Sequence, residues 1–533
     1  MTPTRYDAII VGGGHNGLIT AGYLAKERLK VLVLERRHIV GGACVTEEIK
    51  PGYNVTRTSY VCSLLLPEVI RDFKMKSYGF EVLVPEPHTF YPYPDGRYML
   101  WPADEGGTAR EIAKFSRKDA EAFPRFQSDL AGLQPFVDEI LRTTPPMFPP
   151  RGLKELFAFG KLGRRMLKLG ETRLKHFMEL MTASCDEYLS RRFESDQVKA
   201  ALALNGLIGS CVGPMTPGSA AVMLHHSIGG TIEGQTGAWG YVRGGMSGIA
   251  NTLLRSIQDL GVEVKTRAEV SRFIVEGGVC RGVVLKNGDE HRARMVASGA
   301  DPKVTFLKLT DRKELPDDFV EAIEKFKTQG SSIKVNCALS ELPDWKAIPG
   351  RDPKAPHQAA MFEIAPSIEY LERAYDDLKY GRASLRPMID GNVASVLDDT
   401  LCPKGHHVMS LFVQYGPYKL KEGSWDQARE KVGDQIIDTL AEYAPNIKSA
   451  IIAREVLSPF DLEKEFGLTQ GNIFHGEMTP DQLFFLRPAP RWAQYRTPIR
   501  GLYLCGSGAH PGGGVMGAPG RNAAREMLRD MRR

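Results

Sequence analysis

Three glycines near the N-terminus have the spacing of a phosphate-binding turn. Gly12, Gly14 and Gly17 follow the pattern G-x-G-x-x-G. The first glycine allows a tight turn, and the second lets backbone N–H groups approach a pyrophosphate without a Cβ in the way. The third lets a helix and a strand pack closely. We therefore expect these residues, together with Gly13, to hold the phosphates of a nucleotide.

The elements around these glycines complete a nucleotide-binding unit. An apolar run over residues 6–11 precedes them, a helical pattern follows to about Ala25, and a second apolar run, Val31–Leu34, ends at Glu35. This order is typical of a βαβ unit that binds a dinucleotide. A carboxylate accepts hydrogen bonds from both ribose hydroxyls, so Glu35 favours NAD or FAD over NADP. We place Arg36, which follows it, in the same site.

A second glycine cluster lies close to the C-terminus. Residues 501–517 begin as a short strand, turn through several glycines and lead into a helical pattern over residues 518–531. Bare backbone and a helix N-terminus both favour an anionic ligand. Two such loops at opposite ends of the chain can hold the two ends of a long cofactor, and extended FAD is the natural candidate. The residues that we add to the site are Gly42, Gly506, Ser507, Met516 and Gly517.

The remaining patterns indicate an α/β protein with a discontinuous cofactor domain. A helical pattern after Gly245, two strand patterns, and a hairpin that turns at Asn287 and Gly288 look like the middle of a nucleotide-binding domain. A chain of 533 residues is expected to form two or three domains. We predict a Rossmann-type FAD-binding domain over 1–70, 235–305 and 495–533, a helix-rich insertion over 71–234, and a mixed-sheet substrate domain over 306–494.

Several longer runs resemble one known family. They are Val11–Leu18 with Glu35–Glu48, His225–Met246, Gly471–His475 and Gly501–Ala524. On these runs the chain resembles the FAD-dependent carotenoid and retinoid oxidoreductases, which include the β-carotene ketolases and lie within the amine-oxidase-like flavoproteins. The similarity covers nearly the whole length.

The resemblance implies a cofactor site and a class of reaction. It implies FAD, with the N-terminal glycines at the pyrophosphate, Glu35 on the adenosine ribose, and the backbone of Val270 at the adenine. Gly506 and Ser507 would lie near the pyrophosphate and the ribityl chain. A flavin supplies the redox chemistry, and the protein supplies orientation and exclusion of water. We expect a hydride to move from a hydrophobic, polyene or lipid-like small molecule to flavin N5.

Two histidines are the candidates for a catalytic role. His510 lies in the C-terminal glycine loop, and His475 ends the run GNIFH. Either can take part in the proton transfer that accompanies hydride removal, and either can instead be a loop residue bonded to backbone. The alternative function is a non-catalytic carrier of a lipid or prenyl group, or a regulatory partner, that retains the flavoprotein fold. The electron acceptor and the oligomeric state stay open.

Composition excludes several classes of protein. With 42% apolar and 25% charged residues the chain is globular, and a net charge of +5 over 533 residues does not suggest nucleic acid. The eight cysteines are scattered, without the spacing of a redox pair or a zinc site. The first strand begins too early to leave room for a leader, and no apolar run is long enough to span a membrane. We expect a cytoplasmic protein without a metal, or a mitochondrial one if a leader has been removed.

Residues 151–176 combine basic and apolar side chains in alternation. Lysine and arginine interleave with leucine, phenylalanine and methionine. This pattern is typical of a helix that lies on an anionic membrane, with apolar residues below and cations among the headgroups. It is also the pattern of a surface helix that packs on its own domain, as most amphipathic helices do. Both alternatives stay open; in the first, a peripheral membrane contact here would let an apolar substrate reach the protein.

Overall fold

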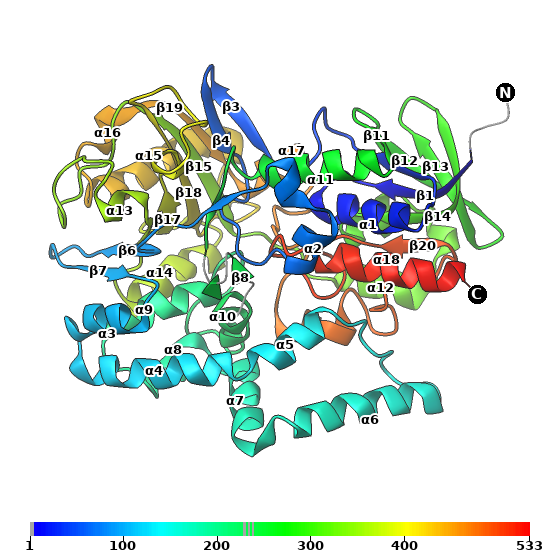
Figure 1. The fold of residues 1–533 in the computed structure, drawn as a ribbon, viewed down its shortest axis with the longest axis horizontal. Helices are drawn as coiled ribbons and strands as arrows, with labels where there is room; N and C mark the ends of the chain where they lie inside the picture. The colour runs from blue at the N-terminus through cyan, green and yellow to red at the C-terminus, as the bar shows by residue number, and fades with distance from the viewer. Residues whose placement is uncertain (1–4, 228–230, 233–234, 237–238, 533) are drawn as a thin grey trace.

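Two large β-sheets and a set of helices make up the fold (Figure 1). A computed structural model of the chain describes residues 5–227, 231–232, 235–236 and 239–532. The gaps interrupt the run 225–246, part of which therefore lies outside the described residues. Among the described residues, no helix combines the length and the apolar character that crossing a bilayer requires.

The first sheet is built from both ends and the middle of the chain. Its order is β11-β2-β1-β14-β13-β12, and β20 pairs with β14. Strands β1, β2, β11, β14 and β20 pair in parallel, whereas β12, β13 and β14 form an antiparallel meander. The bounds are β1 Arg5–Val11, β2 Val31–Leu34, β11 Glu263–Lys265, β12 Val270–Glu276, β13 Val279–Leu285, β14 Glu290–Ser298 and β20 Leu502–Leu504.

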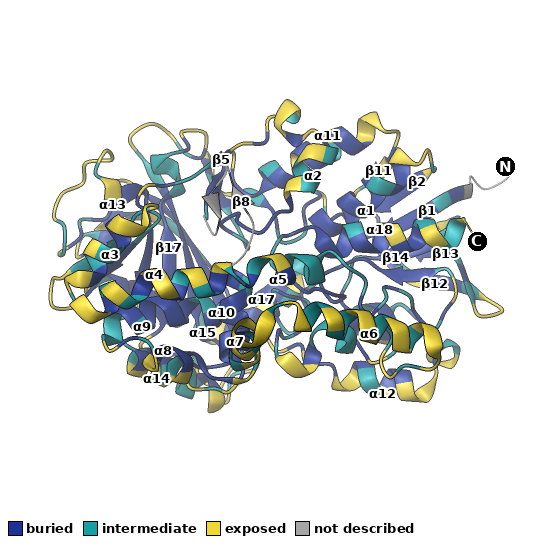
Figure 2. Cartoon of the chain, turned by 60° about the horizontal axis from the view of Figure 1, so that its bottom comes forward, coloured by how far each residue is buried: buried dark blue, intermediate teal, exposed yellow. Residues whose placement is uncertain are grey.

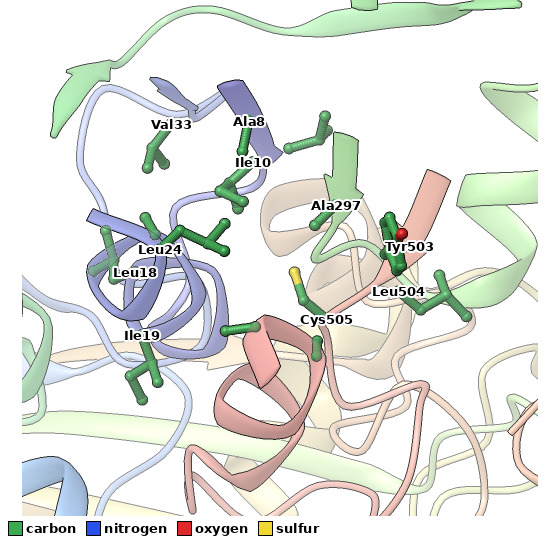
Figure 3. Close-up of a cluster of buried hydrophobic side chains, with 14 of the residues drawn as sticks. Ala8, Ile10, Leu18, Ile19, Leu24, Val33, Ala297, Tyr503, Leu504 and Cys505 are labelled. Carbon is green, nitrogen blue, oxygen red and sulfur yellow. The ribbon is translucent and has the colours of Figure 1, made fainter. Parts of the chain in front are cut away.

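Apolar side chains from these strands and from helices α1, α2, α11, α12 and α18 form one core, part of which is drawn in Figure 3. Ile10 on β1 and Val33 on β2 are fully buried and lie near Leu18 and Leu24 of α1. A parallel strand covered on both faces requires such a continuous apolar run. Helix α1 packs against α11 and α18, which brings the C-terminal helix onto the N-terminal one. The bounds are α1 His15–Lys26, α2 Pro67–Asp72, α11 Ser247–Asp259 and α18 Ala518–Met531.

The second sheet is mixed and has the order β19-β15-β18-β17-β16-β6-β7. Only the β16–β6 pair is parallel within it. Its bounds are β6 Thr89–Pro92, β7 Tyr98–Trp101, β15 Ser332–Leu339, β16 Met361–Ile364, β17 Met388–Asn392, β18 His407–Gln414 and β19 Ile451–Leu457. The helices of the same part of the chain are α12 Asp317–Lys325, α13 Pro356–Ala359, α14 Ile368–Lys379, α15 Trp425–Ala441, α16 Ile447–Ala450 and α17 Pro459–Phe466.

A helical layer covers the lower side of the molecule in Figure 1. Its helices are α3 Glu105–Ala113, α4 Arg117–Ala131, α5 Gln134–Leu141, α6 Leu153–Leu167, α7 Gly170–Thr182, α8 Cys185–Ser190, α9 Asp196–Ala203 and α10 Ser219–Ser227. Three small pairs of strands complete the fold: β3 Thr46–Lys50 with β4 Tyr53–Thr56, β5 Val82–Leu83 with β10 Tyr241–Val242, and β8 Thr231–Ile232 with β9 Gln235–Thr236.

Two parts of the structure pack with a different sheet from the one that the predicted segments suggest. Strands β6 and β7 lie in the expected helix-rich insertion, yet they pair into the second sheet. Helix α12 lies in the expected substrate domain, yet its Phe319 and Ile323 belong to the core of the first sheet. Both elements are short, and their partners are distant in sequence, so local patterns do not reveal which sheet they join.

Candidate cofactor and substrate site

A cavity of about 790 Å³ runs between the two glycine loops and the second sheet. Val11 at the end of β1 and Ala300, just after β14, line it on one side, and Lys334 and Phe412 of the second sheet line it on the other. The predicted site residues that line this cavity are Gly12, Gly14, Gly17, Glu35, Arg36, Gly42, Val270, His475, Gly506 and Ser507. The fold therefore brings the N-terminal loop, the C-terminal loop and the β12 region around a single space.

The N-terminus of α1 fits the phosphates of a dinucleotide. Gly14 is the N-cap, no side chain caps the helix, and its first turn holds no acidic residue. A Cβ added at Gly14 would have its nearest neighbours 3.9 and 4.0 Å away, at Gly42 Cα and Gly41 O. Bare backbone without a close neighbour therefore lies beside uncapped N–H groups at the cavity wall. That arrangement suits an anion, because the helix end is partially positive.

Glu35 is held in place at the end of β2 by backbone donors. The N–H of Gly13 donates to Oε2 at 2.7 Å, and the N–H of Arg37 donates to Oε1 at 2.8 Å. Each carboxylate oxygen can accept further bonds, so the side chain can still receive two ribose hydroxyls. Arg36 reaches across the same end of the cavity and donates to the carbonyl of Glu465 at 2.6 Å.

Four predicted residues lie outside the cavity wall. Gly13 supports Glu35, and the carbonyl of Met516 accepts from Leu66 N–H at 3.0 Å. Gly517 is the N-cap of α18, and its φ of +77° is a conformation that favours glycine. The Nε2 of the buried His510 ring donates a 3.0 Å hydrogen bond to the carbonyl oxygen of Ile140. In the structure these residues shape the loops around the cavity, and their contact with a ligand stays a prediction.

His475 lines the cavity, and a second histidine joins it. The Nδ1 of His475 is buried without a hydrogen-bond partner, and burial lowers the pKa of the ring. His15, in the first turn of α1, has an unpartnered Nε2, and burial lowers its pKa to about 4. Both rings are therefore neutral at pH 7 and can hydrogen-bond a ligand. The sequence analysis missed His15, although its position within the glycine motif was a usable signal.

A cluster of ionisable side chains forms the wall on the second sheet. Lys334 on β15, Glu363 on β16 and Asp390 on β17 all line the cavity and are buried. The hydroxyl of Tyr60 donates to Asp390 Oδ2, and Lys334 Nζ lies 4.6 Å from the centroid of the Tyr60 ring. The sequence analysis missed this cluster, although a lysine within the apolar run of β15 was a signal for it.

Burial displaces the pKa of each member of this cluster. It lowers the pKa of Lys334 to about 7, with Asp390 acting in the opposite direction. Burial also raises the pKa of Asp390 to about 7 and that of Glu363 well above its ordinary value, with the Asp390 charge adding to the latter. Such displaced values in a cavity mark candidates for proton transfer or for binding a polar group.

Beyond the loops and the ionisable cluster, much of the cavity wall is apolar, with a few polar side chains such as Thr108, Gln127 and Asn205 among the apolar ones. Aromatic and aliphatic side chains from the helical layer and the neighbouring loops form the apolar part. They are Leu64, Trp101, Phe123, Phe126, Leu130, Leu202, Ile208, Trp239, Ile473 and Phe474. A cavity with an apolar wall and a few converging polar groups is typical of a small-molecule site.

Comparison with known proteins decides the family. The model of the flavin containing amine oxidoreductases matches residues 17–528. The chain belongs to this family. It is 42% identical to pyridine nucleotide-disulfide oxidoreductase domain-containing protein 2 of Rattus norvegicus, over 99% of this chain and 94% of that protein. It is 24% identical to a lycopene-forming phytoene desaturase of Pseudescherichia vulneris, over 98% of this chain and 99% of that protein.

Solved structures show the same fold. Wild-type putrescine oxidase bound to putrescine superimposes with a TM-score of 0.61 at 14% identity, and the match covers 99% of this chain and 100% of that one. The predicted relationship to amine-oxidase-like and carotenoid-type flavoproteins is thus confirmed. The chain is an FAD-dependent oxidoreductase, and FAD is its cofactor. The uncapped helix α1, the bare backbone of Gly14 at the cavity wall and the carboxylate of Glu35 fit this cofactor.

Proposed function

We propose that this oxidoreductase acts on a hydrophobic small molecule and removes a hydride and a proton from adjacent carbon atoms. One observation carries the substrate class: the cavity at the glycine loops continues into a wall of apolar side chains. Such a wall favours an apolar ligand, because each Å² of apolar surface removed from water contributes about 25 cal/mol. The relationship to a phytoene desaturase supports the same class.

The residues of the chain orient the substrate, exclude water and receive the proton. FAD, when bound, supplies the hydride acceptor. The apolar wall holds the carbon skeleton and keeps water out. Lys334 is the candidate base, since a buried amine with a pKa of about 7 is partly neutral at pH 7 and can accept the proton that leaves the substrate. The role of His475, which also lines the cavity, stays a prediction.

Anaerobic reduction tests the substrate class. Protein loaded with FAD is mixed without oxygen with retinol, phytoene or putrescine, and the flavin absorbance is followed. We expect at least one of the two hydrophobic compounds to bleach the flavin bands, whereas putrescine leaves them unchanged. Bleaching by putrescine alone would contradict the proposed substrate class. Subsequent admission of oxygen or a quinone then distinguishes an oxidase from a dehydrogenase.

We also propose that residues 151–176 bind an anionic membrane surface. No residue of α6 is buried, and Leu153 and Phe157 are 86% and 78% exposed (Figure 2). Lys154 and Lys161 on the same helix are also exposed. Exposed apolar side chains interleaved with cations suit anionic headgroups better than they suit bulk water. A membrane contact would bring a hydrophobic substrate to the protein directly.

A further inference from the structure

The ionisable cluster on the second sheet has a geometry that a purely apolar substrate would not use. We propose that Asp390 and Glu363 form a subsite that binds a hydroxyl group at one end of an otherwise apolar substrate. The inference rests on the proposed function, because it names the polar end of the substrate that occupies the same cavity. It concerns residues of the second sheet, apart from the glycine loops at which FAD binds.

The subsite is a row that crosses four strands. Lys334 on β15 is paired with Phe412 on β18, and Phe412 is paired with Asp390 on β17. Asp390 in turn lies directly opposite Glu363 on β16. Directly paired residues project from the same face of a sheet. All four line the cavity, so the row presents a lysine, an aromatic ring and two carboxyl groups to one ligand.

The hydrogen bonds within the row leave two oxygens free. Asp390 Oδ2 accepts from the hydroxyl of Tyr60, and Lys334 Nζ donates to Ser410 Oγ. Asp390 Oδ1 and Glu363 Oε2 are buried and have no hydrogen-bond partner. Asp390 is fully buried and Glu363 is 7% exposed, so bulk water does not readily reach them. Unpartnered buried oxygens are costly, and a ligand atom placed between them would remove that cost.

The charges of the row select a neutral group. Two carboxyl groups that face each other in a buried cavity do not readily ionise together, so one of them stays protonated. Burial and the neighbouring Asp390 raise the pKa of Glu363 well above its ordinary value, which leaves Glu363 as the protonated member. The row then offers one O–H donor and one carboxylate acceptor. A hydroxyl can accept from the first and donate to the second.

Other polar groups fit this row less well. An ether oxygen accepts a hydrogen bond but cannot donate one, so Asp390 Oδ1 would stay unpartnered. An ammonium group donates but cannot accept, so the O–H group of a protonated Glu363 would stay unpartnered. Phe412 within the row and Met361, on the same strand as Glu363, are apolar and line the cavity. They suit a hydrocarbon body attached to the hydroxyl.

Three probes of similar length test the subsite. The FAD-loaded protein is titrated with 1-octanol, with its isomer methyl heptyl ether, and with octylammonium, and binding is measured by calorimetry and by the shift of the flavin spectrum. We expect 1-octanol to bind roughly tenfold or more tightly than the ether, because the ether leaves a buried acceptor unpaired. Equal binding of the alcohol and the ether, or tighter binding of octylammonium, overturns the inference.

Variants of Glu363 test whether the preference for the alcohol over the ether depends on this side chain. Glu363→Met removes both hydrogen-bonding oxygens at similar length, and we expect the preference for the alcohol to fall to less than about threefold. Glu363→Gln keeps a donor and an acceptor and is expected to retain most of the preference. The control Glu324→Met changes an exposed residue of α12 and should leave all three affinities unaltered.

The design separates the subsite from the proposed function. If Glu363→Met weakens FAD binding and leaves the ratio of alcohol to ether unchanged, the row serves the cofactor and the inference is overturned. If Glu363→Met does not fold, the relative affinities of the wild-type protein for the alcohol, the ether and octylammonium still test the inference. If FAD-loaded protein binds the alcohol selectively but no hydrophobic compound bleaches its flavin, the subsite stands and the proposed function fails.

Discussion

The Nδ2 of Asn16 donates a hydrogen bond of 3.2 Å to the Oγ of Ser507, and both side chains are buried. Asn16 lies in the first turn of α1, whereas Ser507 belongs to the C-terminal glycine loop. The bond thus joins the two ends of the chain at the wall of the cofactor cavity. The Oδ1 of Asn16 also accepts from the N–H of Gly520 at 3.4 Å.

A double-mutant cycle tests this link. We expect Asn16→Ala and Ser507→Ala each to lower the free energy of unfolding, Asn16→Ala by about 1–2 kcal/mol because it also unpairs Gly520. The double variant should lose about 1 kcal/mol less than the sum of the single losses, since the two residues share one bond. Chemical denaturation of the three variants measures this. Strict additivity would show that the bond contributes nothing.

Gly14 and Gly17, the second and third glycines of the N-terminal motif, are expected to differ in their effect on stability. A Cβ at Gly17 would overlap the carbonyl oxygen of Gly12, so Gly17→Ala should cost about 1–3 kcal/mol. A Cβ at Gly14 meets no atom closer than 3.9 Å. Gly14→Ala should therefore cost at most about 1 kcal/mol, the difference between glycine and alanine at an N-cap. Thermal and chemical unfolding without FAD compares the two, and the reverse order would contradict the packing described here.

The buried Lys334 predicts a pH dependence of stability. Its pKa is about 7 in the folded chain and 10.5 in the unfolded chain. Between these values the unfolded chain binds a proton that the folded chain does not, so this residue makes stability rise with pH across that window. The limiting slope is about 1.4 kcal/mol per pH unit.

The measurement compares wild type with Lys334→Met from pH 7 to pH 10. The stability of the wild type relative to the variant should increase as the pH rises. Asp390, Glu455 and Cys337 raise the pKa of Lys334, and Lys334 in turn lowers the pKa of Asp390. Without Lys334, Asp390 is harder to ionise as the pH rises, which acts in the same direction as the expected difference. A difference in stability that does not change with pH would show that Lys334 is not an uncharged buried amine.

The exposed face of α6 predicts binding to anionic vesicles. Leu153→Glu combined with Phe157→Glu should weaken co-sedimentation with phosphatidylserine vesicles at least tenfold, because two apolar side chains contribute about 1.5–3 kcal/mol each when buried. The melting temperature should not change, since both residues are exposed. Leu385→Glu, at a residue exposed outside α6, is the matched control. Wild-type protein that does not co-sediment with anionic vesicles would contradict the proposal.

The sequence predicted the cofactor half of the molecule well because its signals are local. The glycine turns, the apolar run of β2 and the helix over residues 518–531 each depend on neighbouring residues, and the structure has that helix at Ala518–Met531. The hairpin at Asn287 and Gly288 is also found, between β13 and β14. Turn residues and the regular spacing of apolar residues predict such elements from neighbouring residues alone.

The substrate half could not be predicted in the same way. Lys334, Glu363 and Asp390 come from three strands, and only the register of the second sheet puts them in one row. Similarly, β6 joins this sheet by pairing with β16, far along the chain. The imidazole of His510 turns toward Ile140, a contact that depends on the position of α5. Long-range pairing of this kind leaves no local pattern.

The FAD content of the purified protein tests the central claim most directly. The two glycine loops are taken to hold one FAD, so wild-type protein should carry or take up one FAD per chain, measured by its absorbance after release. Gly14→Ala should fold and yet bind FAD at least tenfold more weakly, because its Cβ occupies the space that a pyrophosphate needs. A colourless wild-type protein that cannot be reconstituted, or Gly14→Ala with unaltered affinity for FAD, would contradict the account.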